Sequence, residues 1–204
     1  MNVTIVDYGM GNINSVCSAL NYIGVNNINI SYDFNTLKNS DKLILPGVGA
    51  FNQAMKSIKE RNIDVYLKEL VLNNKTPILG ICLGMQLLGK SSSEGGFSEG
   101  LGFVNANVMR FKNNNLIVPH VGFNQVKINS KSKLYSGFED DEADFYFTHS
   151  YRMMSDENIN QSSCLYDEDF IASFELDNIA GTQFHPELSQ HNGLKLLSNF
   201  IKKI

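Results

Sequence analysis

The sequence lacks any long apolar run. No stretch approaches the ~18 consecutive apolar residues that a membrane-spanning helix needs. The N-terminus also lacks a basic segment followed by an extended apolar run, which a secretory signal would have. We therefore expect a cytoplasmic protein.

Strong charge of either sign is also missing. The net charge is −4, and lysines and acidic residues are interspersed instead of forming blocks. Such a surface gives nucleic acid or an anionic membrane no obvious footprint. We expect neither as a partner.

Cysteine is scarce and scattered. Cys17, Cys82 and Cys164 are an odd number, lie far apart and include no Cys-x-x-Cys pair. A disulfide framework or a thiolate zinc site is therefore not supported. The histidines show no His-x-x-x-His spacing either. The sequence predicts neither a metal nor another cofactor, and each cysteine needs its own explanation.

What the sequence does contain is a repeated strand–turn–helix pattern. Short apolar runs at residues 3–9, 42–45 and 77–82 are each associated with glycines and followed by residues at helical spacing. Strands alternating with helices predict an α/β fold with a largely parallel sheet covered on both faces. Cys17 lies on the apolar stripe of the first predicted helix, which favours a packing role. The length of the chain suits one core, and we expect a single domain over residues 1–204.

The pattern changes after about residue 100. Strand-like runs are then separated by polar turns, which predicts additional antiparallel or mixed strands in the C-terminal half, at residues 103–111, 124–128, 144–151, 171–176 and 179–184. Between the two halves, the segment 90–100 (KSSSEGGFSEG) is predicted to be a mobile loop. The last segment returns to helical spacing, with one apolar face formed by Leu194, Leu197, Ile201 and Ile204.

Cys82 stands where a strand passes into a helix, with Gly80 and Gly84 on either side. This is the pattern of a nucleophile elbow, in which a tight turn displays the central side chain and only small neighbours avoid a clash. Amide groups at the start of the following helix favour the thiolate. A small buried cysteine is the alternative, but glycines on both sides favour a nucleophile.

His185 follows another predicted strand and is separated from Glu187 by Pro186. A thiolate nucleophile needs a group that handles protons, and histidine is the usual one. In an extended segment, residues two apart point the same way, so Glu187 could orient the imidazole and stabilise its cationic form. The predicted catalytic group is Cys82, His185 and Glu187.

The other three histidines carry weaker signals. His120 and His149 also follow strand-like runs, and His191 stands at the start of the last helix. Taken alone, each is better explained as a hydrogen-bonded structural residue or a surface residue than as a catalyst.

The turn Pro46–Gly49 is a candidate oxyanion hole. Its glycines let backbone N–H groups approach a reacting carbonyl, and the N–H of Leu83, next to the nucleophile, would supply a second donor. An ordinary strand-to-helix turn is the alternative, which Cys82 makes less attractive.

Several motifs together carry a resemblance to a known family. The chain resembles class I glutamine amidotransferases, and within them the glutaminase subunits of imidazole glycerol phosphate synthase in histidine biosynthesis, through DYGMGN, PGVGAF, GICLGMQLL, PHVGFN, THSY and GTQFHPE. The resemblance covers essentially the whole chain. It implies a three-layer fold and an enzyme that releases ammonia from glutamine through a cysteine thioester.

The resemblance also implies roles for residues that the sequence alone does not single out. Gln86 and Glu94 would hold the amino-acid end of glutamine. Backbone groups around His149, Ser150 and Tyr151 would assist. Gly49 or Val48 would donate to the oxyanion, either in the resting loop or only after the loop flips. Taken alone, Gln86 is equally a helix surface residue and Glu94 a solvated loop acid.

A partner is implied as well, because the family passes ammonia to a separate (β/α)8-barrel cyclase in a heterodimer. The implied partner surface includes Asn12, His120, Phe123, Asn124 and Leu188. Two of these positions depart from the family pattern, which usually has tryptophan at Phe123 and a basic residue at Leu188.

Other functions stay open on the sequence. A paralogous glutaminase could supply ammonia to a sugar amidotransferase instead of the histidine-pathway cyclase. A catalytically silent interaction subunit is disfavoured by the presence of all three predicted catalytic residues. A cysteine hydrolase of another kind or a redox-sensing thiol fits the predicted fold.

Overall fold

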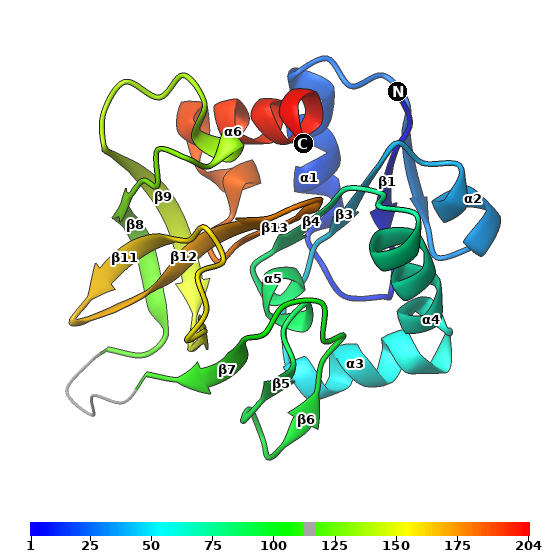
Figure 1. Cartoon of the computed structure of the whole chain (residues 1–204), viewed down its shortest axis with the longest axis horizontal. Helices are drawn as coiled ribbons and strands as arrows, with labels where there is room; N and C mark the ends of the chain where they lie inside the picture. The colour runs from blue at the N-terminus through cyan, green and yellow to red at the C-terminus, as the bar shows by residue number, and fades with distance from the viewer. Residues whose placement is uncertain (112–116) are drawn as a thin grey trace.

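A nine-stranded mixed sheet forms the centre of the computed structural model, which describes residues 1–111 and 117–204 (Figure 1). In sheet order its strands are β2 (Ile28–Ser31), β1 (Val3–Val6), β3 (Lys42–Leu45), β4 (Ile78–Ile81), β13 (Ile179–Thr182), β12 (Glu168–Leu176), β11 (Ser162–Tyr166), β8 (His120–Lys127) and β9 (Glu142–His149). The pairs from β2 to β13 are parallel and the pairs from β13 to β9 are antiparallel. The change of strand direction that the sequence predicts is therefore confirmed.

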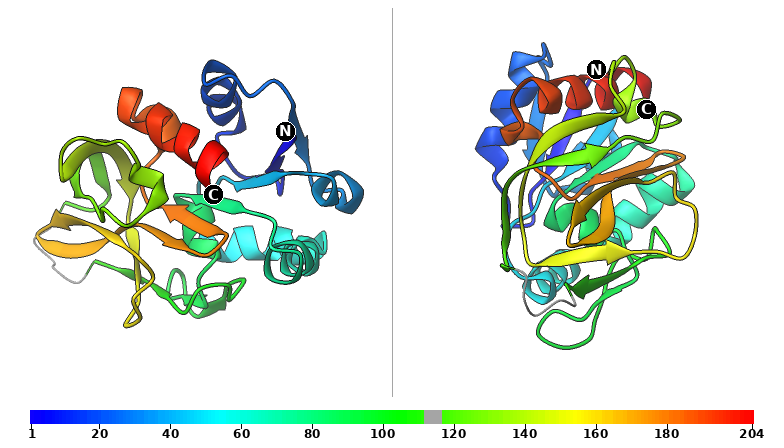
Figure 2. Two further views of the ribbon diagram at one scale, coloured as in Figure 1. Left: turned by 45° about the horizontal axis from the view of Figure 1, so that its top comes forward. Right: turned by 90° about the vertical axis from the view of Figure 1, so that its left-hand side faces the viewer.

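Alternating side chains of the parallel strands pack into two cores, one on each face of the sheet. Leu43 and Leu45 of β3 face a cluster with α3 (Phe51–Glu60), α4 (Ile63–Leu67) and η1 (Lys68–Asn73), a π-helical continuation of α4. Ile44, between them, faces the opposite cluster with α1 (Ile13–Tyr22) and α6 (Gln190–Lys203). This alternation follows from the two-residue period of a strand, and it gives the three layers visible in Figures 1 and 2, where α1 and α6 lie side by side.

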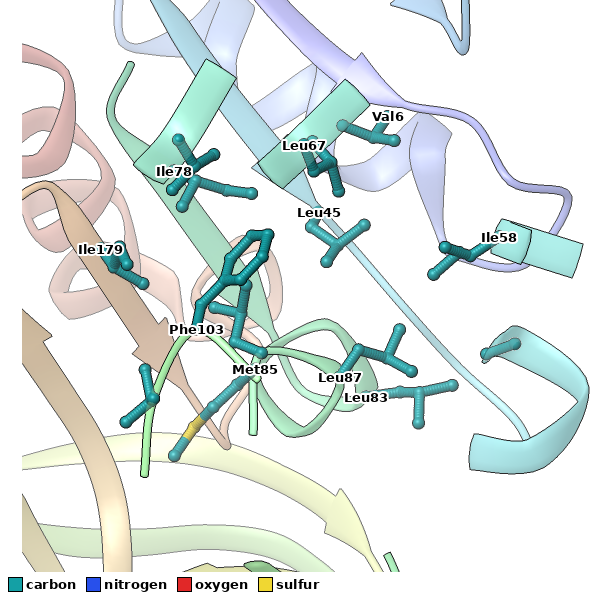
Figure 3. Close-up of a cluster of buried hydrophobic side chains, with 14 of the residues drawn as sticks. Val6, Leu45, Ile58, Leu67, Ile78, Leu83, Met85, Leu87, Phe103 and Ile179 are labelled. Carbon is teal, nitrogen blue, oxygen red and sulfur yellow. The ribbon is translucent and has the colours of Figure 1, made fainter. Parts of the chain in front are cut away.

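A short helix, α5 (Leu83–Leu87), ties the region after β4 to the first of these cores. Leu83, Met85 and Leu87 are buried in the same cluster as residues from β3, β4 and α3 (Figure 3). The start of α5 is therefore anchored by packing on three sides, and α2 (Phe34–Lys38) lies further out beside β1 and β2.

A second, four-stranded sheet lies below α5 in the view of Figure 1. Its strands, in order, are β10 (Tyr151–Met154), β7 (Asn107–Arg110), β5 (Ser91–Ser92) and β6 (Ser98–Glu99). Because β5 and β6 pair as an antiparallel hairpin, the prediction that residues 90–100 form only a loop is corrected. The polar and glycine-rich composition suggested a loop, but β5 pairs with β7 and β6 pairs with β5, so both ends of the segment belong to the small sheet.

The chain passes from the large sheet to the small one at Ser150, between β9 and β10. Two 3-10 helices complete the architecture, η2 (Lys133–Tyr135) and η3 (Pro186–Leu188). Of the predicted apolar face of the last helix, Leu197 and Ile201 are buried in α6, and Leu194 and Ile204 pack partly against the same core. Within residues 1–111 and 117–204, no helix is both long and apolar enough to span a bilayer.

Candidate active site

Cys82 occupies the turn between β4 and α5 with φ +53° and ψ −109°. A positive φ is unfavourable for a residue with a side chain and persists only where the surroundings hold it. The backbone conformation expected of a nucleophile elbow is therefore present at Cys82.

The two glycines beside this turn are required by close backbone packing. A Cβ atom on Gly84 would lie 1.7 Å from the carbonyl oxygen of Leu45, and one on Gly80 would lie 2.7 Å from the backbone of Gly84 and Met85. Neither backbone contact can be relieved by turning a side chain. The glycine pattern around Cys82 is thus explained by the approach of α5 to β3 at Gly84 and to β4 at Gly80.

His185 and Glu187 are paired and buried. Nδ1 of His185 lies 2.8 Å from Oε1 of Glu187, and their side chains are 3% and 1% exposed. The pairing is as expected, but its backbone basis is not, because Pro186 begins a 3-10 turn instead of continuing an extended segment. The turn is braced by Ser189, whose hydroxyl donates to the His185 carbonyl at 2.6 Å.

The electrostatic surroundings favour a protonated His185. Burial alone would lower its pKa, but the neighbouring Cys82 sulfur and the hydrogen-bonded Glu187 carboxylate raise the pKa above its ordinary value. Nε2 of His185 is buried and has no hydrogen-bond partner among the described residues. Nδ1 is thus committed to Glu187, and Nε2 is left unpaired.

Polar groups also hold the Cys82 sulfur from two further sides. Sγ lies 3.8 Å from the Thr148 carbonyl oxygen, and Nε2 of Gln183 donates to Sγ at 3.8 Å. Gln183 was not predicted, although it stands two residues before His185 in the same motif. Its fully buried amide at the end of β13 is a tertiary feature that the sequence alone does not reveal.

A cavity of about 340 Å³ opens in front of Cys82. The structure brings every residue predicted for the oxyanion hole and for substrate binding to its wall, together with Pro119 and Thr148: Val48, Gly49, Leu83, Gln86, Glu94, His149, Ser150 and Tyr151. The volume suits a small ligand.

Two predicted substrate residues already make contacts within the protein. Nε2 of Gln86 donates to the Tyr151 carbonyl and to Oε1 of Gln183, both at 2.9 Å. Oε2 of Glu94 accepts the N–H of Phe51 at 2.8 Å. Both side chains are thereby held in place at the cavity wall.

The candidate oxyanion turn is unevenly held. A Cβ atom on Gly47 would lie 2.4 Å from the hydroxyl of Tyr8, whereas one on Gly49 would meet only the end of the Met10 side chain. Gly49 has φ +102°, and the neighbouring Val48 side chain is 43% exposed. The first half of the turn is therefore packed tightly, whereas the neighbour of the second half is the flexible end of a side chain.

The residues expected at a partner surface do not all reach the surface. Asn12 and Phe123 are exposed, Leu188 is 39% exposed and Asn124 is half-buried. His120 is a correction, because its side chain is buried between aromatic rings, and it begins β8 instead of following a strand. Its alternation with exposed neighbours along β8 directs it inward.

Known proteins resemble this chain over nearly its whole length. A profile of the family described as glutamine amidotransferase class-I matches residues 4–204. The chain is 46% identical over 201 residues to the imidazole glycerol phosphate synthase subunit HisH 1 of Campylobacter jejuni strain RM1221, covering 98% of this chain and 99% of the relative. It is 42% identical to the HisH subunit of Aquifex aeolicus strain VF5, covering 100% and 97%.

The fold is shared with solved structures of lower identity. The structure of PurLQS from Thermotoga maritima matches with a TM-score of 0.73 at 16% identity, covering 98% of this chain and 97% of that one. Such a likeness supports the arrangement of strands and helices and nothing finer. Since a family profile spans nearly all of the chain and the relatives align from end to end, the chain belongs to the class I glutamine amidotransferase family.

Proposed function

We propose that this chain is the glutaminase subunit of an imidazole glycerol phosphate synthase. It hydrolyses glutamine to glutamate and ammonia and passes the ammonia to a separate cyclase subunit. The observation that carries the proposal is the strained elbow at Cys82, opening on a cavity lined by Gln86 and Glu94. The identity to subunits of that name supports the choice of pathway.

The first half of the reaction is thioester formation. The Cys82 thiolate attacks the side-chain amide carbon of glutamine, and backbone N–H groups of Leu83 and of Val48 or Gly49 stabilise the oxyanion. His185, whose pKa is raised, gives its Nε2 proton to the leaving nitrogen as the C–N bond breaks. Ammonia leaves and a glutamyl thioester remains on Cys82.

The second half is hydrolysis. Neutral His185 takes a proton from water, and the resulting hydroxide adds to the thioester carbon. The C–S bond then breaks, releasing glutamate and restoring the thiolate beside protonated His185. Glu187 keeps the imidazole oriented in both halves through the 2.8 Å contact to Nδ1.

The cyclase would dock beside the cavity on what we call the partner face, formed by Val121, Phe123 and Leu188. Val121 and Phe123 lie on the same side of β8 and are 57% and 51% exposed, and Leu188 directly follows Glu187. Three exposed apolar side chains near the candidate active site favour a protein partner over open solvent.

A second acceptor for the ammonia is favoured by the partner face itself. Phe123 and Leu188 stand where the family resemblance described above implies a tryptophan and a basic residue. The Campylobacter jejuni relative has a numbered name, HisH 1. A paralogous glutaminase could therefore serve an amidotransferase that acts on a sugar.

The test is reconstitution with each candidate partner. Glutamate release is measured for the chain alone, with the histidine-pathway cyclase and with the sugar amidotransferase, each with and without its own acceptor substrate. Because one oxyanion donor is worth about a hundredfold in rate, we expect about that stimulation by the correct liganded partner. Full activity without any partner would contradict dependence on a partner, and stimulation by the sugar enzyme alone would replace the histidine pathway.

A further inference from the structure

Two buried histidines have no part in the chemistry proposed above, yet they connect to the cavity wall. His120 and His149 are paired across β8 and β9. Nδ1 of His149 lies 2.8 Å from the carbonyl oxygen of Tyr151, and Nε2 of His149 lies 3.0 Å from Nδ1 of His120. Nε2 of His120 lies 3.4 Å from the amide nitrogen of Asn124.

The acceptors fix where each proton lies. A carbonyl oxygen only accepts, so Nδ1 of His149 carries a proton, and neutral His149 accepts at Nε2. Nδ1 of His120 must then donate, which leaves its Nε2 to accept from Asn124. The Asn124 amide agrees with this direction, because its nitrogen also donates to the Leu165 carbonyl at 3.3 Å and its oxygen accepts from the Gln125 N–H at 2.8 Å.

Both imidazoles are held neutral by their surroundings. Burial lowers the pKa of His120 to about 4 and that of His149 to about 3. The His120 ring stacks on Tyr166 and Phe147, with ring centres 3.9 and 4.8 Å away. The direction of the hydrogen-bond chain from Asn124 to Tyr151 is therefore fixed.

The chain ends on a carbonyl that serves the glutamine cavity. The Tyr151 oxygen also accepts from Nε2 of Gln86 at 2.9 Å, and the Thr148 carbonyl oxygen, before Ser150, lies 3.8 Å from the Cys82 sulfur. Residues 148–151 form one wall of the cavity at the point where the backbone leaves the large sheet. The His149 side chain bridges this bend.

We propose that Asn124, His120 and His149 form a one-way hydrogen-bond relay that positions the 148–151 wall and Gln86 for binding glutamine. The proposal rests on the glutaminase function given above. It makes His120 and His149 positioning residues, because neither side chain is assigned a contact with the reacting atoms. A purely structural pair would stabilise the fold without affecting how the cavity recognises glutamine.

The test compares two electrophiles at Cys82 in the full-length chain. Iodoacetamide needs only a reactive thiol, whereas acivicin, a glutamine-like electrophile, needs the aligned cavity. In His120→Phe the ring can keep its stacking while the hydrogen bonds are lost. We expect its labelling rate with acivicin, relative to that with iodoacetamide, to fall roughly five-fold, as for the loss of one net hydrogen bond.

Two further variants separate the relay from general stability. His120→Asn keeps an amide donor near the Nδ1 position. Its ratio of acivicin to iodoacetamide labelling rates should therefore be close to that of the wild type and well above that of His120→Phe. Tyr135→Phe removes a buried 2.7 Å hydrogen bond to Ser173 elsewhere in the same core. It should lower the melting temperature and leave the ratio unchanged. If His120→Phe does not fold, Asn124→Leu removes the first bond of the relay at a half-buried site and should lower the ratio two- to three-fold.

A ratio equal to wild type in folded His120→Phe, or in Asn124→Leu, would overturn the relay. A wild-type chain that acivicin does not label at Cys82 would instead overturn the proposed glutaminase function. Histidine-selective nitrogen NMR then tests the relay separately. Both rings should keep the proton on Nδ1 from about pH 5 to about pH 8, and a ring with the proton on Nε2 would exclude the proposed direction.

Discussion

The two sides of the cavity are held together by different physics. On the side built from the N-terminal half, Cys82 is fixed by backbone packing, with the Leu45 carbonyl close enough to Gly84 to exclude even a methyl group. On the side built from the C-terminal half, side-chain hydrogen bonds hold buried imidazoles, such as the 2.8 Å contact between His149 and the Tyr151 carbonyl in the cavity wall. The first side is a steric arrangement and the second an electrostatic one.

This difference predicts how each side fails. Added volume should damage the cysteine side, since neighbouring backbone cannot move out of the way. On the C-terminal side, a changed protonation state or a lost hydrogen-bond donor should reduce activity, even where the side-chain shape is preserved. Changes that keep both volume and protons should have little effect on either side.

The largest effect is expected when the nucleophile itself is removed. Cys82→Ala should lower glutamine hydrolysis by at least about a thousand-fold, because no other group in the cavity supplies a thiolate. The fold should survive, since alanine is no larger than cysteine at this φ. Steady-state glutamate release and a melting curve test both statements, and residual wild-type rates would remove Cys82 from its role.

On the histidine side, the proton donor should matter more than the residue that orients it. His185→Asn should cost roughly a thousand-fold in hydrolysis and Glu187→Gln roughly a hundred-fold, because the amide can still contact Nδ1 but no longer favours the cation. The measurement is kcat for glutamate release under saturating glutamine. The reverse order of the two losses would mean that the roles assigned to His185 and Glu187 are wrong.

The steric side can be tested with two single methyl groups. Gly84→Ala should destabilise the protein by about 3 kcal/mol or more, because its Cβ meets the Leu45 carbonyl at 1.7 Å. Gly49→Ala should cost only about 1 kcal/mol for its positive φ, since its Cβ meets the movable end of Met10. Denaturant unfolding gives both values, and equal losses would mean that the two glycines are held alike.

A further effect on stability should appear in acid. The folded pKa values of His120 and His149 lie below the ordinary value of 6.5, at about 4 and about 3. Below about pH 6.5 the unfolded chain binds protons at these positions and the folded chain does not. As the pH is lowered below about 6.5, the free energy of unfolding should decrease by up to about 1.4 kcal/mol per pH unit for each histidine.

Burial lowers the pKa of His149, as do the positive charges of His120, His185 and Arg152. His149 therefore also makes the fold less stable as the pH is lowered. His185 has the opposite sign, because its folded pKa is raised, so its contribution is complete below the unfolded value and is lost at higher pH. Denaturant unfolding from about pH 7 to about pH 4.5 tests the balance. His120→Phe should flatten the acid slope, and an unchanged slope would show that His120 is already charged in the fold.

Local backbone chemistry accounts for what could be predicted from the sequence. The glycines around Cys82, the strand before it and the short His185–Glu187 spacing involve neighbouring residues, so their pattern is visible in the sequence. The change from parallel to antiparallel strands follows in the same way from strand length and turn composition. These features predicted the fold class and the candidate catalytic residues, and the motifs of the sequence carried the resemblance to the family.

Only the tertiary structure decided which side chains are buried and what they contact. Gln183 next to Cys82, the hairpin within residues 90–100 and the inward position of His120 all depend on partners far away in the chain. The hydrogen-bond relay joins residues from separate strands in the same way. Burial and hydrogen bonding between distant segments arise only when the sheets pack. The periodic patterns of helices and strands involve neighbouring residues and do not predict such contacts.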